Sequence, residues 1–249
     1  MRKKTAKGSK STVKWEDAPT EITRRDAFVT IYGDTDTGKT TFALSAPGPI
    51  ALFNASEKIE GIVQPAAREK EIRIYDFAAD ILPGSPQTVA KHAATEWGKF
   101  KDAITDAMSW AKTIVVDTHS EAWELIRWAR FGKLTQVKPY HYGPVNAEWM
   151  AIFKQFRNLE DVNFIGVGMI KEAYKNDKPT GKMIQAGQKQ MGYMSDVVLR
   201  ASRDGDDFVV EVEKPWWNGP LKGMTLENEL ATFGNVLGML SETDPDEWG

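Results

Sequence analysis

Short apolar runs alternate with helical spacing of apolar residues along most of the chain. Short runs rich in apolar and β-branched residues are typical of strands, whereas apolar residues at every third or fourth position are typical of helices. The runs at residues 113–116 and 163–167 show no alternation, which indicates strands buried on both faces. Strands are predicted at residues 27–32, 50–53, 72–77, 113–116 and 163–167, and helices at residues 40–45, 97–112, 121–131 and 147–159.

The order of these elements predicts an α/β fold. Strands that alternate with helices form mainly parallel sheets, because each helix carries the chain back across a face of the sheet. Later in the chain, two apolar runs at residues 197–201 and 208–212 flank Asp204 and Gly205, which is a strong signal for a β-hairpin. The pattern therefore predicts a mainly parallel central sheet with helices on both faces and an antiparallel hairpin at one edge.

Composition narrows the class of protein. The 249 residues are 41% apolar and 27% charged, which is typical of one globular domain. No apolar run approaches the roughly 20 residues that span a membrane, and none follows the basic first residues as in a secretory signal. The chain has no cysteine and three histidines, which excludes disulfides and disfavours a multi-histidine metal site. A reducing cytoplasm is the expected location.

Charge is distributed unevenly along the chain. The net charge is −3, so any contact with nucleic acid must come from local basic patches. The first residues are basic and lack a hydrophobic pattern, and the last residues are acidic. We therefore expect a basic mobile tail at residues 1–20, an ordered domain at residues 21–240 and an acidic mobile tail at residues 241–249.

One segment matches the phosphate-binding pattern G-x-x-x-x-G-K-[ST] without a mismatch, between a predicted strand and a predicted helix. Two glycines, Gly33 and Gly38, let the backbone bring N–H groups close to phosphate oxygens. Lys39 supplies a positive charge to the β- and γ-phosphates, and Thr40 supplies a hydroxyl to Mg²⁺. The residues predicted to bind the nucleotide are Gly33, Asp34, Thr35, Asp36, Thr37, Gly38, Lys39, Thr40 and Thr41.

A second nucleotide-binding element ends in an acid. Asp117 follows the buried run at residues 113–116 and is expected at the carboxyl edge of the sheet, where ligands bind in open α/β folds. Its carboxylate is predicted to hold Mg²⁺ together with Thr40, and Lys39 and Asp117 are the first two members of the predicted catalytic set. Guanine recognition needs an N/T-K-x-D element, which residues 176–177 do not fit, so ATP is favoured over GTP.

These two elements resemble those of RecA-type ATPases. Residues 114–121 look like the RecA-type V-V-D-[ST] strand with the helix after it, and residues 33–41 look like the RecA-type phosphate loop. Over residues 24–214 the chain is similar to phage-encoded, core-only RecA-like ATPases that promote single-strand annealing or recombination. The resemblance implies ATP and Mg²⁺ as cofactors, ATP hydrolysis, single-stranded DNA as a partner, and a ring or filament of identical subunits in the cytoplasm of a bacterial host. A single-strand-binding protein is a further candidate partner.

The resemblance also implies an acid that polarises the attacking water. Where the family has an Asp and a Glu after the second strand, this sequence has Asn54 and Ser56, with Glu57 one residue later. Glu57 is therefore the candidate base and the third member of the catalytic set. The competing candidate is Glu121, one helical turn beyond Asp117, and a surface acid is the alternative interpretation of Glu57.

Two basic segments are candidates for contact with DNA. The resemblance places one DNA-contact loop after the strand at residues 163–167, and residues 174–194 are rich in Lys, Gly and Gln with a single acid. Because Pro179 and the glycines disfavour regular structure, a loop of about 20 residues is expected. Residues 133–142 are the second candidate segment, and residues 2–14 add basic charge. The alternative interpretation is a solvated loop for residues 174–194 and a packed connector for residues 133–142. The predicted contacts are Lys175, Lys178, Lys182 and Lys189.

We therefore expect an ATP- and Mg²⁺-dependent RecA-like ATPase that acts on single-stranded DNA in phage-type recombination or strand annealing. A nucleotide-switched assembly protein with little turnover is an alternative, since such a protein needs the same phosphate loop. A small-molecule kinase is a third possibility, but Arg127 and Arg130 do not form the Arg-rich lid that such kinases usually carry.

Overall fold

One sheet runs through the residues that the computed structural model describes, which are 26–55, 59–77, 84–134, 137–175, 178–215 and 219–248. Within them the sheet has nine strands, of which eight follow the order β3-β2-β4-β5-β1-β7-β8-β9 and the ninth, β6, pairs with β5 off this path. The strands are β1 (Phe28–Gly33), β2 (Ile50–Asn54), β3 (Ile72–Asp76), β4 (Thr113–Asp117), β5 (Asn163–Lys175), β6 (Lys178–Gln185), β7 (Val197–Asp204), β8 (Asp207–Lys214) and β9 (Thr225–Glu227).

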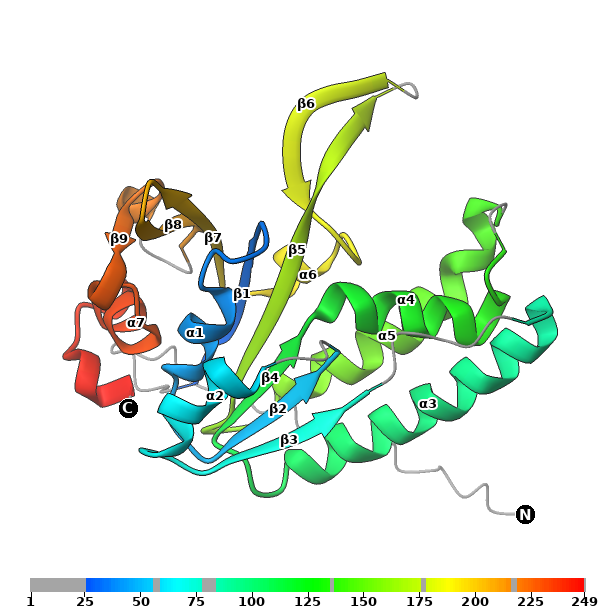
Figure 1. The fold of residues 1–249 in the computed structure, drawn as a ribbon, viewed down its shortest axis with the longest axis horizontal. Helices are drawn as coiled ribbons and strands as arrows, with labels where there is room; N and C mark the ends of the chain where they lie inside the picture. The colour runs from blue at the N-terminus through cyan, green and yellow to red at the C-terminus, as the bar shows by residue number, and fades with distance from the viewer. Residues whose placement is uncertain are drawn as a thin grey trace, which may run out of the picture.

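The centre of this sheet is parallel, as predicted. Strands β3, β2, β4, β5, β1 and β7 all pair in parallel with their neighbours, whereas β7–β8 and β8–β9 are antiparallel pairs at one edge (Figure 1). Asp117, the last residue of β4, is in register with Asn54 of β2 and Val167 of β5. The carboxyl ends of the parallel strands therefore meet along one edge, where open α/β sheets bind ligands.

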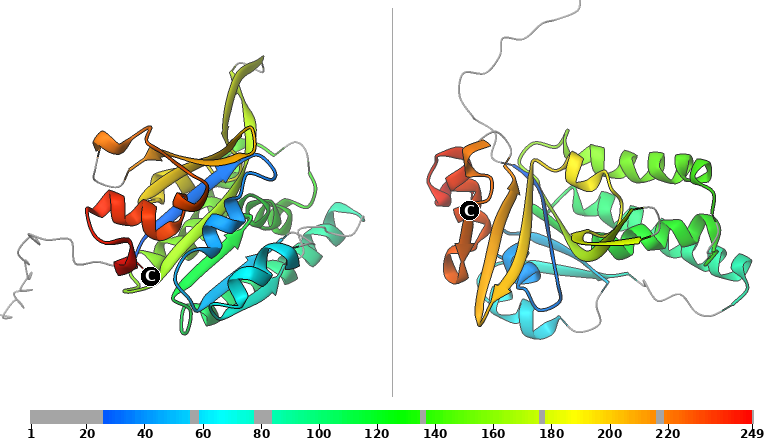
Figure 2. Two further views of the ribbon diagram at one scale, coloured as in Figure 1. Left: turned by 60° about the vertical axis from the view of Figure 1, so that its left-hand side comes forward. Right: turned by 90° about the horizontal axis from the view of Figure 1, so that it is seen from above.

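Helices cover both faces of the sheet (Figure 2). On one face, α3, α4 and α5 pack with Ile114 and Val116 of β4; on the other, α1, α2 and α7 pack with Val115. This two-sided burial explains why residues 113–116 lack polar alternation. Among the described residues, no helix has the length and apolar character needed to cross a membrane. The α-helices are α1 (Lys39–Leu44), α2 (Glu60–Ala67), α3 (Pro86–Ala107), α4 (His119–Phe131), α5 (Tyr142–Phe156), α6 (Met191–Met194) and α7 (Phe233–Ser241); the 3-10 helices are η1 (Pro139–His141), η2 (Gly219–Leu221), η3 (Asn228–Leu230) and η4 (Pro245–Trp248).

Two helices begin earlier than the apolar spacing predicts. Helix α3 begins at Pro86 rather than at residue 97, because the Ser85 hydroxyl caps it by accepting a hydrogen bond of 3.2 Å from the Thr88 N–H. Helix α5 begins at Tyr142 rather than at residue 147, directly after η1. Local capping and turn geometry set these starts, and the first turns have too few apolar residues to be recognised by periodicity.

The prediction of an irregular loop at residues 174–194 is wrong. Strand β5 continues to Lys175 and pairs antiparallel with β6, so the two form a long hairpin that projects beyond the sheet (Figure 1). Pro179 and Gly181 are tolerated because β6 pairs only with β5 in the described part of the chain, so it is an edge strand on which a missing N–H does no harm. Gly181 takes a positive φ of 70° close to the register shift between Glu172 and Tyr174.

The expected mobile tail at residues 241–249 is also wrong for its described part. Residues after α7 turn back and form η4, and Trp248 is only 2% exposed. Its indole N–H donates to the hydroxyls of Ser241 at 3.0 Å and Thr243 at 3.1 Å. One buried tryptophan therefore anchors an otherwise acidic segment. The basic tail at residues 1–20 lies outside the described residues and stays a prediction.

Candidate nucleotide-binding site

The predicted phosphate loop joins β1 to α1 at the carboxyl edge of the sheet. Gly38 ends the loop with a φ of 74° and caps α1, and its carbonyl accepts a hydrogen bond of 2.9 Å from the Phe42 N–H. Asp36 also has a positive φ, of 59°. An L-residue rarely takes the conformation found at position 38, so a glycine there keeps the loop unstrained. The loop therefore has the compact form that its sequence predicts.

The two predicted magnesium ligands are in direct contact. The Thr40 hydroxyl donates a hydrogen bond of 2.5 Å to Oδ2 of Asp117, although the two residues are 77 positions apart. Asp117 is 6% exposed at the end of β4, and the peptide bond that follows it is cis. A hydroxyl and a carboxylate are hard oxygen donors of the kind that Mg²⁺ takes, so the pair fits this ion. Within the described ranges no group of three or more His, Asp or Glu could hold a metal ion.

Lys39 and Asp117 influence each other's protonation across this site. Burial lowers the pKa of the Lys39 ammonium below its usual value, while the carboxylates of Asp117, Asp34 and Asp36 oppose that shift. Burial raises the pKa of the Asp117 carboxyl, while the hydrogen bond from Thr40 and the charge of Lys39 oppose it. The Lys39 ammonium donates to the Asp34 carbonyl and to the Thr37 hydroxyl, so it lies folded along the loop. The structure therefore holds a cation against the backbone of the predicted phosphate loop.

A cavity of about 430 Å³ opens beside the loop. Its walls come from residues 33–41, from the start of α2, from Asp117 and the first residues of α4, and from Met169 and Ile170 of β5. Glu121 is among these residues. Its carboxylate accepts a hydrogen bond of 2.9 Å from the Thr118 hydroxyl, and the Glu121 N–H donates to the Thr118 hydroxyl oxygen at 3.2 Å, so Thr118 caps the start of α4.

Of the two candidate bases, the described residues include only Glu121. Glu57 lies outside them, so its role stays a prediction. Asn54 is buried at the end of β2, where its side-chain amide donates to the Asp76 carboxylate at 2.7 Å. It therefore has a structural partner next to Asp117, and it does not line the cavity.

Two residues that the sequence analysis did not select connect this site to the β5–β6 hairpin. His119, the first residue of α4, is fully buried, and its Nε2 lies 2.8 Å from the side-chain nitrogen of Gln185 at the end of β6. Burial lowers the pKa of the imidazole to about 4, so it is neutral at pH 7. The ring fits because Gly168 and Gly187 leave room; a β-carbon on Gly168 would lie 2.6 Å from Nε2. The sequence signal for this contact is the set of glycines at positions 166, 168 and 187, because a glycine within a strand often marks a site where another group packs closely against the backbone.

The β7–β8 hairpin supports the phosphate loop from behind. A β-carbon on Gly33 would lie 2.2 Å from the Ala201 carbonyl oxygen, and one on Gly38 would lie 2.7 Å from the Phe208 ring. Between these two contacts, Nε of Arg203 donates a hydrogen bond of 2.9 Å to the Asp36 carbonyl. Arg203 and Phe208 are paired across the β7–β8 ladder. The contact of Arg203 with Asp36 and the contact of Phe208 with Gly38 therefore come from one residue pair of the hairpin. Hairpin and loop are distant in sequence, and no local pattern indicates this support.

Arg203→Ala is expected to weaken ATP·Mg²⁺ binding about 5-fold with little change in the melting temperature. One hydrogen bond to an exposed side chain contributes about 1 kcal/mol, and its loss frees the Asp36 carbonyl to move. Isothermal titration with a non-hydrolysable ATP analogue measures the effect. Arg200→Ala is the matched control, because Arg200 lies on the same strand but lines a different cavity. Equal affinities for the two variants would show that Arg203 does not position the loop.

The candidate DNA contacts lie away from the phosphate loop. Lys175, Lys178 and Lys182 are exposed on the β5–β6 hairpin, and Lys189 is exposed in the connection to α6. The second candidate segment, residues 133–142, joins α4 to α5 at the far end of the helical layer (Figure 1), and residues 135–136 of it lie outside the described ranges. The structure thus separates the two segments, and the four lysines on and next to the hairpin are all exposed.

The phosphate loop, its lysine and the contact between Thr40 and Asp117 define a P-loop nucleotide-binding domain with the predicted RecA-like α/β fold. A protein-family model described as "AAA domain" matches residues 25–234, so the chain belongs to that family. Among solved structures, the crystal structure of the RadB recombinase is similar with 13% sequence identity and a TM-score of 0.47, over 81% of this chain and 86% of that one. No curated protein matches this chain with significant sequence similarity.

Proposed function

We propose that this protein hydrolyses ATP in the presence of Mg²⁺ and acts on single-stranded DNA in phage-type recombination or strand annealing. The observation that supports hydrolysis best is the contact between Thr40 and Asp117 inside a cavity that also holds Lys39 and Glu121. A cation, a metal-binding pair and a carboxylate within one cavity are the parts that phosphoryl transfer to water requires.

Each side chain has one role in this proposal. Lys39 binds the β- and γ-phosphates, and Thr40 and Asp117 hold Mg²⁺, which neutralises charge on the phosphates when it is bound. Glu121 orients the attacking water and accepts its proton in this proposal, because it lines the cavity from the first turn of α4. Glu57 is retained as the alternative base, on the resemblance alone.

Glu121→Gln is expected to slow ATP turnover by about 100-fold while leaving ATP affinity unchanged. Glutamine keeps an oxygen that can accept from the Thr118 hydroxyl, and the cap on the backbone N–H is untouched, so the helix start is preserved and only the base is removed. Steady-state phosphate release and analogue binding measure the two quantities. Glu124→Gln, on the same helix but paired with Arg127, is the control and should behave as wild type. Undiminished turnover in Glu121→Gln would exclude Glu121 as the base, and Glu57→Gln would then be measured.

The exposed basic hairpin supports the DNA part of the proposal. Lysines in an extended, solvent-facing segment can follow a phosphate backbone without reading its sequence. Three consecutive residues after Asp117 link the two regions: Thr118 lines the cavity, His119 contacts Gln185 at the base of the hairpin, and the Ser120 hydroxyl accepts a bond of 3.3 Å from the Met169 N–H. We infer that a nucleotide bound at the cavity biases the hairpin through these contacts.

Assembly completes the proposal. Copies of the chain are proposed to form a ring or filament along a single strand, since one hairpin contacts only a few nucleotides, and a single-strand-binding protein is a proposed partner at the same DNA. Sedimentation with and without an ATP analogue and a single strand tests assembly, independently of turnover.

A further inference from the structure

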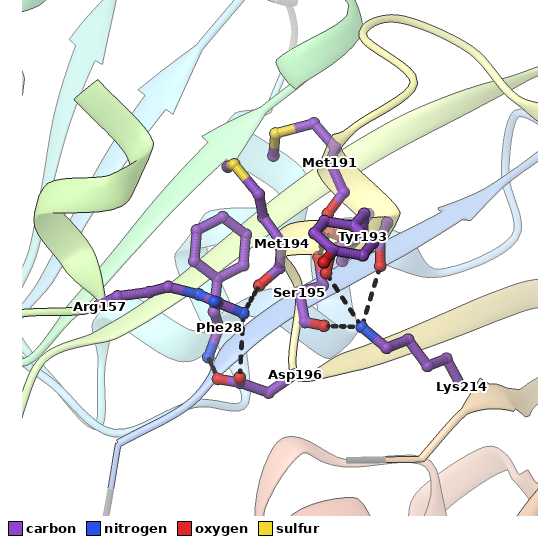
Figure 3. A network of polar contacts seen from close by, with 10 residues as sticks. Phe28, Arg157, Met191, Tyr193, Met194, Ser195, Asp196 and Lys214 are labelled. Atoms are coloured by element: carbon purple, nitrogen blue, oxygen red, sulfur yellow. Dashed lines mark hydrogen bonds and ion pairs between the residues drawn. The ribbon is translucent and has the colours of Figure 1, made fainter. Parts of the chain in front are cut away.

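A short helical turn after the β5–β6 hairpin presents one aromatic side chain to solvent. This turn is α6, and Tyr193 within it is 82% exposed, whereas Met191 and Met194 on its other side are buried. Figure 3 shows the polar network around it. An exposed tyrosine makes few packing contacts, so its own side chain does not hold a short turn in place. The contacts that hold this turn come from other residues.

Two cations fix the carbonyl end of the turn. The Lys214 ammonium donates to the carbonyl oxygens of Gly192 and Tyr193, each at 3.2 Å, and to that of Ser195 (Figure 3). Nη2 of Arg157 donates to the Met194 carbonyl at 2.6 Å. These two long side chains come from β8 and from the end of α5, so elements on both sides of the turn hold it.

Buried contacts fix the same turn from below. The Ser195 hydroxyl donates to the Met191 carbonyl at 2.8 Å and shares a hydrogen bond with the Thr30 hydroxyl of β1. Asp196 accepts a bond of 2.9 Å from the Phe28 N–H and lies 3.8 Å from Arg157. The backbone that carries the exposed ring is therefore anchored to the central strand β1, and only the Tyr193 side chain retains freedom.

A groove of about 530 Å³ lies beside this turn, and Gly192, the residue before Tyr193, is among the residues that line it. Lys182 and Gln185 of β6 and Arg200 of β7 also line the groove. So does Tyr32, whose hydroxyl donates to Glu213 at 2.5 Å. The cations among the lining residues are Lys182, which is exposed, and Arg200, which is half-buried. An aromatic ring beside cations is the arrangement that binds single strands, since bases stack and phosphates pair with charge.

We propose that Tyr193 is a stacking platform for one base of the bound single strand, whose backbone follows Lys182 and Arg200 along the groove. This inference rests on the proposed action on single-stranded DNA. Because the turn is fixed before DNA arrives, stacking costs little ordering of the backbone. Stacking on a ring tolerates every base, so the site recognises unpaired bases without sequence preference.

The test compares an oligothymidylate with an abasic strand of equal length, using fluorescence anisotropy at one salt concentration. Tyr193→Ala is expected to bind the oligothymidylate about 10-fold more weakly than wild type and the abasic strand equally well, while Tyr193→Phe keeps wild-type affinity for both. The 82% exposure of Tyr193 makes these variants safe for folding. Lys214→Met, which releases the turn, is expected to weaken binding to the oligothymidylate alone.

The possible results are distinguishable. If wild type binds neither strand, the proposed DNA function fails and the inference with it. If wild type binds the oligothymidylate and Tyr193→Ala binds it equally, the stacking site is wrong while the DNA function stands. If Tyr193→Ala loses self-association in sedimentation but keeps its DNA affinity, the ring contacts a second copy of this chain, which also overturns the stacking assignment.

Discussion

Lys39→Ala is expected to raise the dissociation constant for ATP·Mg²⁺ on the order of 100-fold. The ammonium is held within the phosphate loop by the Asp34 carbonyl and the Thr37 hydroxyl, so its charge is placed before the nucleotide arrives. Charge-assisted bonds to phosphate contribute about 1.5–3 kcal/mol, and the partly buried site screens them less than water does. Isothermal titration with a non-hydrolysable analogue measures the loss directly.

The same variant is expected to fold normally. Lys39 lies in a loop open to the cavity, and its removal deletes no apolar contact of the core, so the change in unfolding free energy should stay within about 1 kcal/mol. Lys91→Ala, at an exposed position of α3, is the charge-matched control and should keep wild-type affinity. A folded Lys39→Ala protein with unchanged ATP affinity would remove the nucleotide assignment.

Replacing Lys175, Lys178, Lys182 and Lys189 together with alanine is expected to weaken single-strand binding and flatten its dependence on salt. Each phosphate contact that is lost should reduce the magnitude of the log–log salt slope by about 0.7. The hairpin contacts His119 through Gln185, so wild-type affinity should be higher with a non-hydrolysable ATP analogue than with ADP. ATP binding by the variant should be unchanged, because the phosphate loop is untouched.

A matched control removes the same charge elsewhere. Lys91, Lys99 and Lys101 of α3 and Lys154 of α5 lie on the helical layer, away from the hairpin, and their joint replacement changes the net charge equally. If both quadruple variants lose affinity alike, only total charge matters. If the hairpin variant keeps the wild-type affinity and slope, the hairpin is not the contact, and truncation of residues 2–14 becomes the next test.

The sequence predicts the elements that the site needs because their chemistry is local. The phosphate loop is one contiguous segment, and Asp117 ends a run whose two-sided burial makes it apolar throughout. The antiparallel hairpin of β7 and β8 is likewise set by a local turn, which lies at Gly205 and Asp206, one residue beyond the predicted pair. In each case, a short stretch of residues specifies both its structure and its place in the sheet.

The remaining features depend on contacts between distant segments. Arg203 supports Asp36, and His119 meets Gln185, only because the sheet order brings β7 beside β1 and β6 beside α4. The sequence predicts a loop where the structure has the β5–β6 hairpin, because Pro179 and Gly181 break strands in a sheet interior but not at an edge. Strand propensity is a property of the residue type, whereas the position of a strand in the sheet decides whether a proline or glycine is tolerated in it.

ATP hydrolysis measured with and without single-stranded DNA tests the central claim most directly. We expect Mg²⁺-dependent multiple turnover that rises when a single strand is added and falls to background in Lys39→Ala. Substoichiometric turnover that a single strand leaves unchanged would contradict it and favour a nucleotide-switched assembly protein.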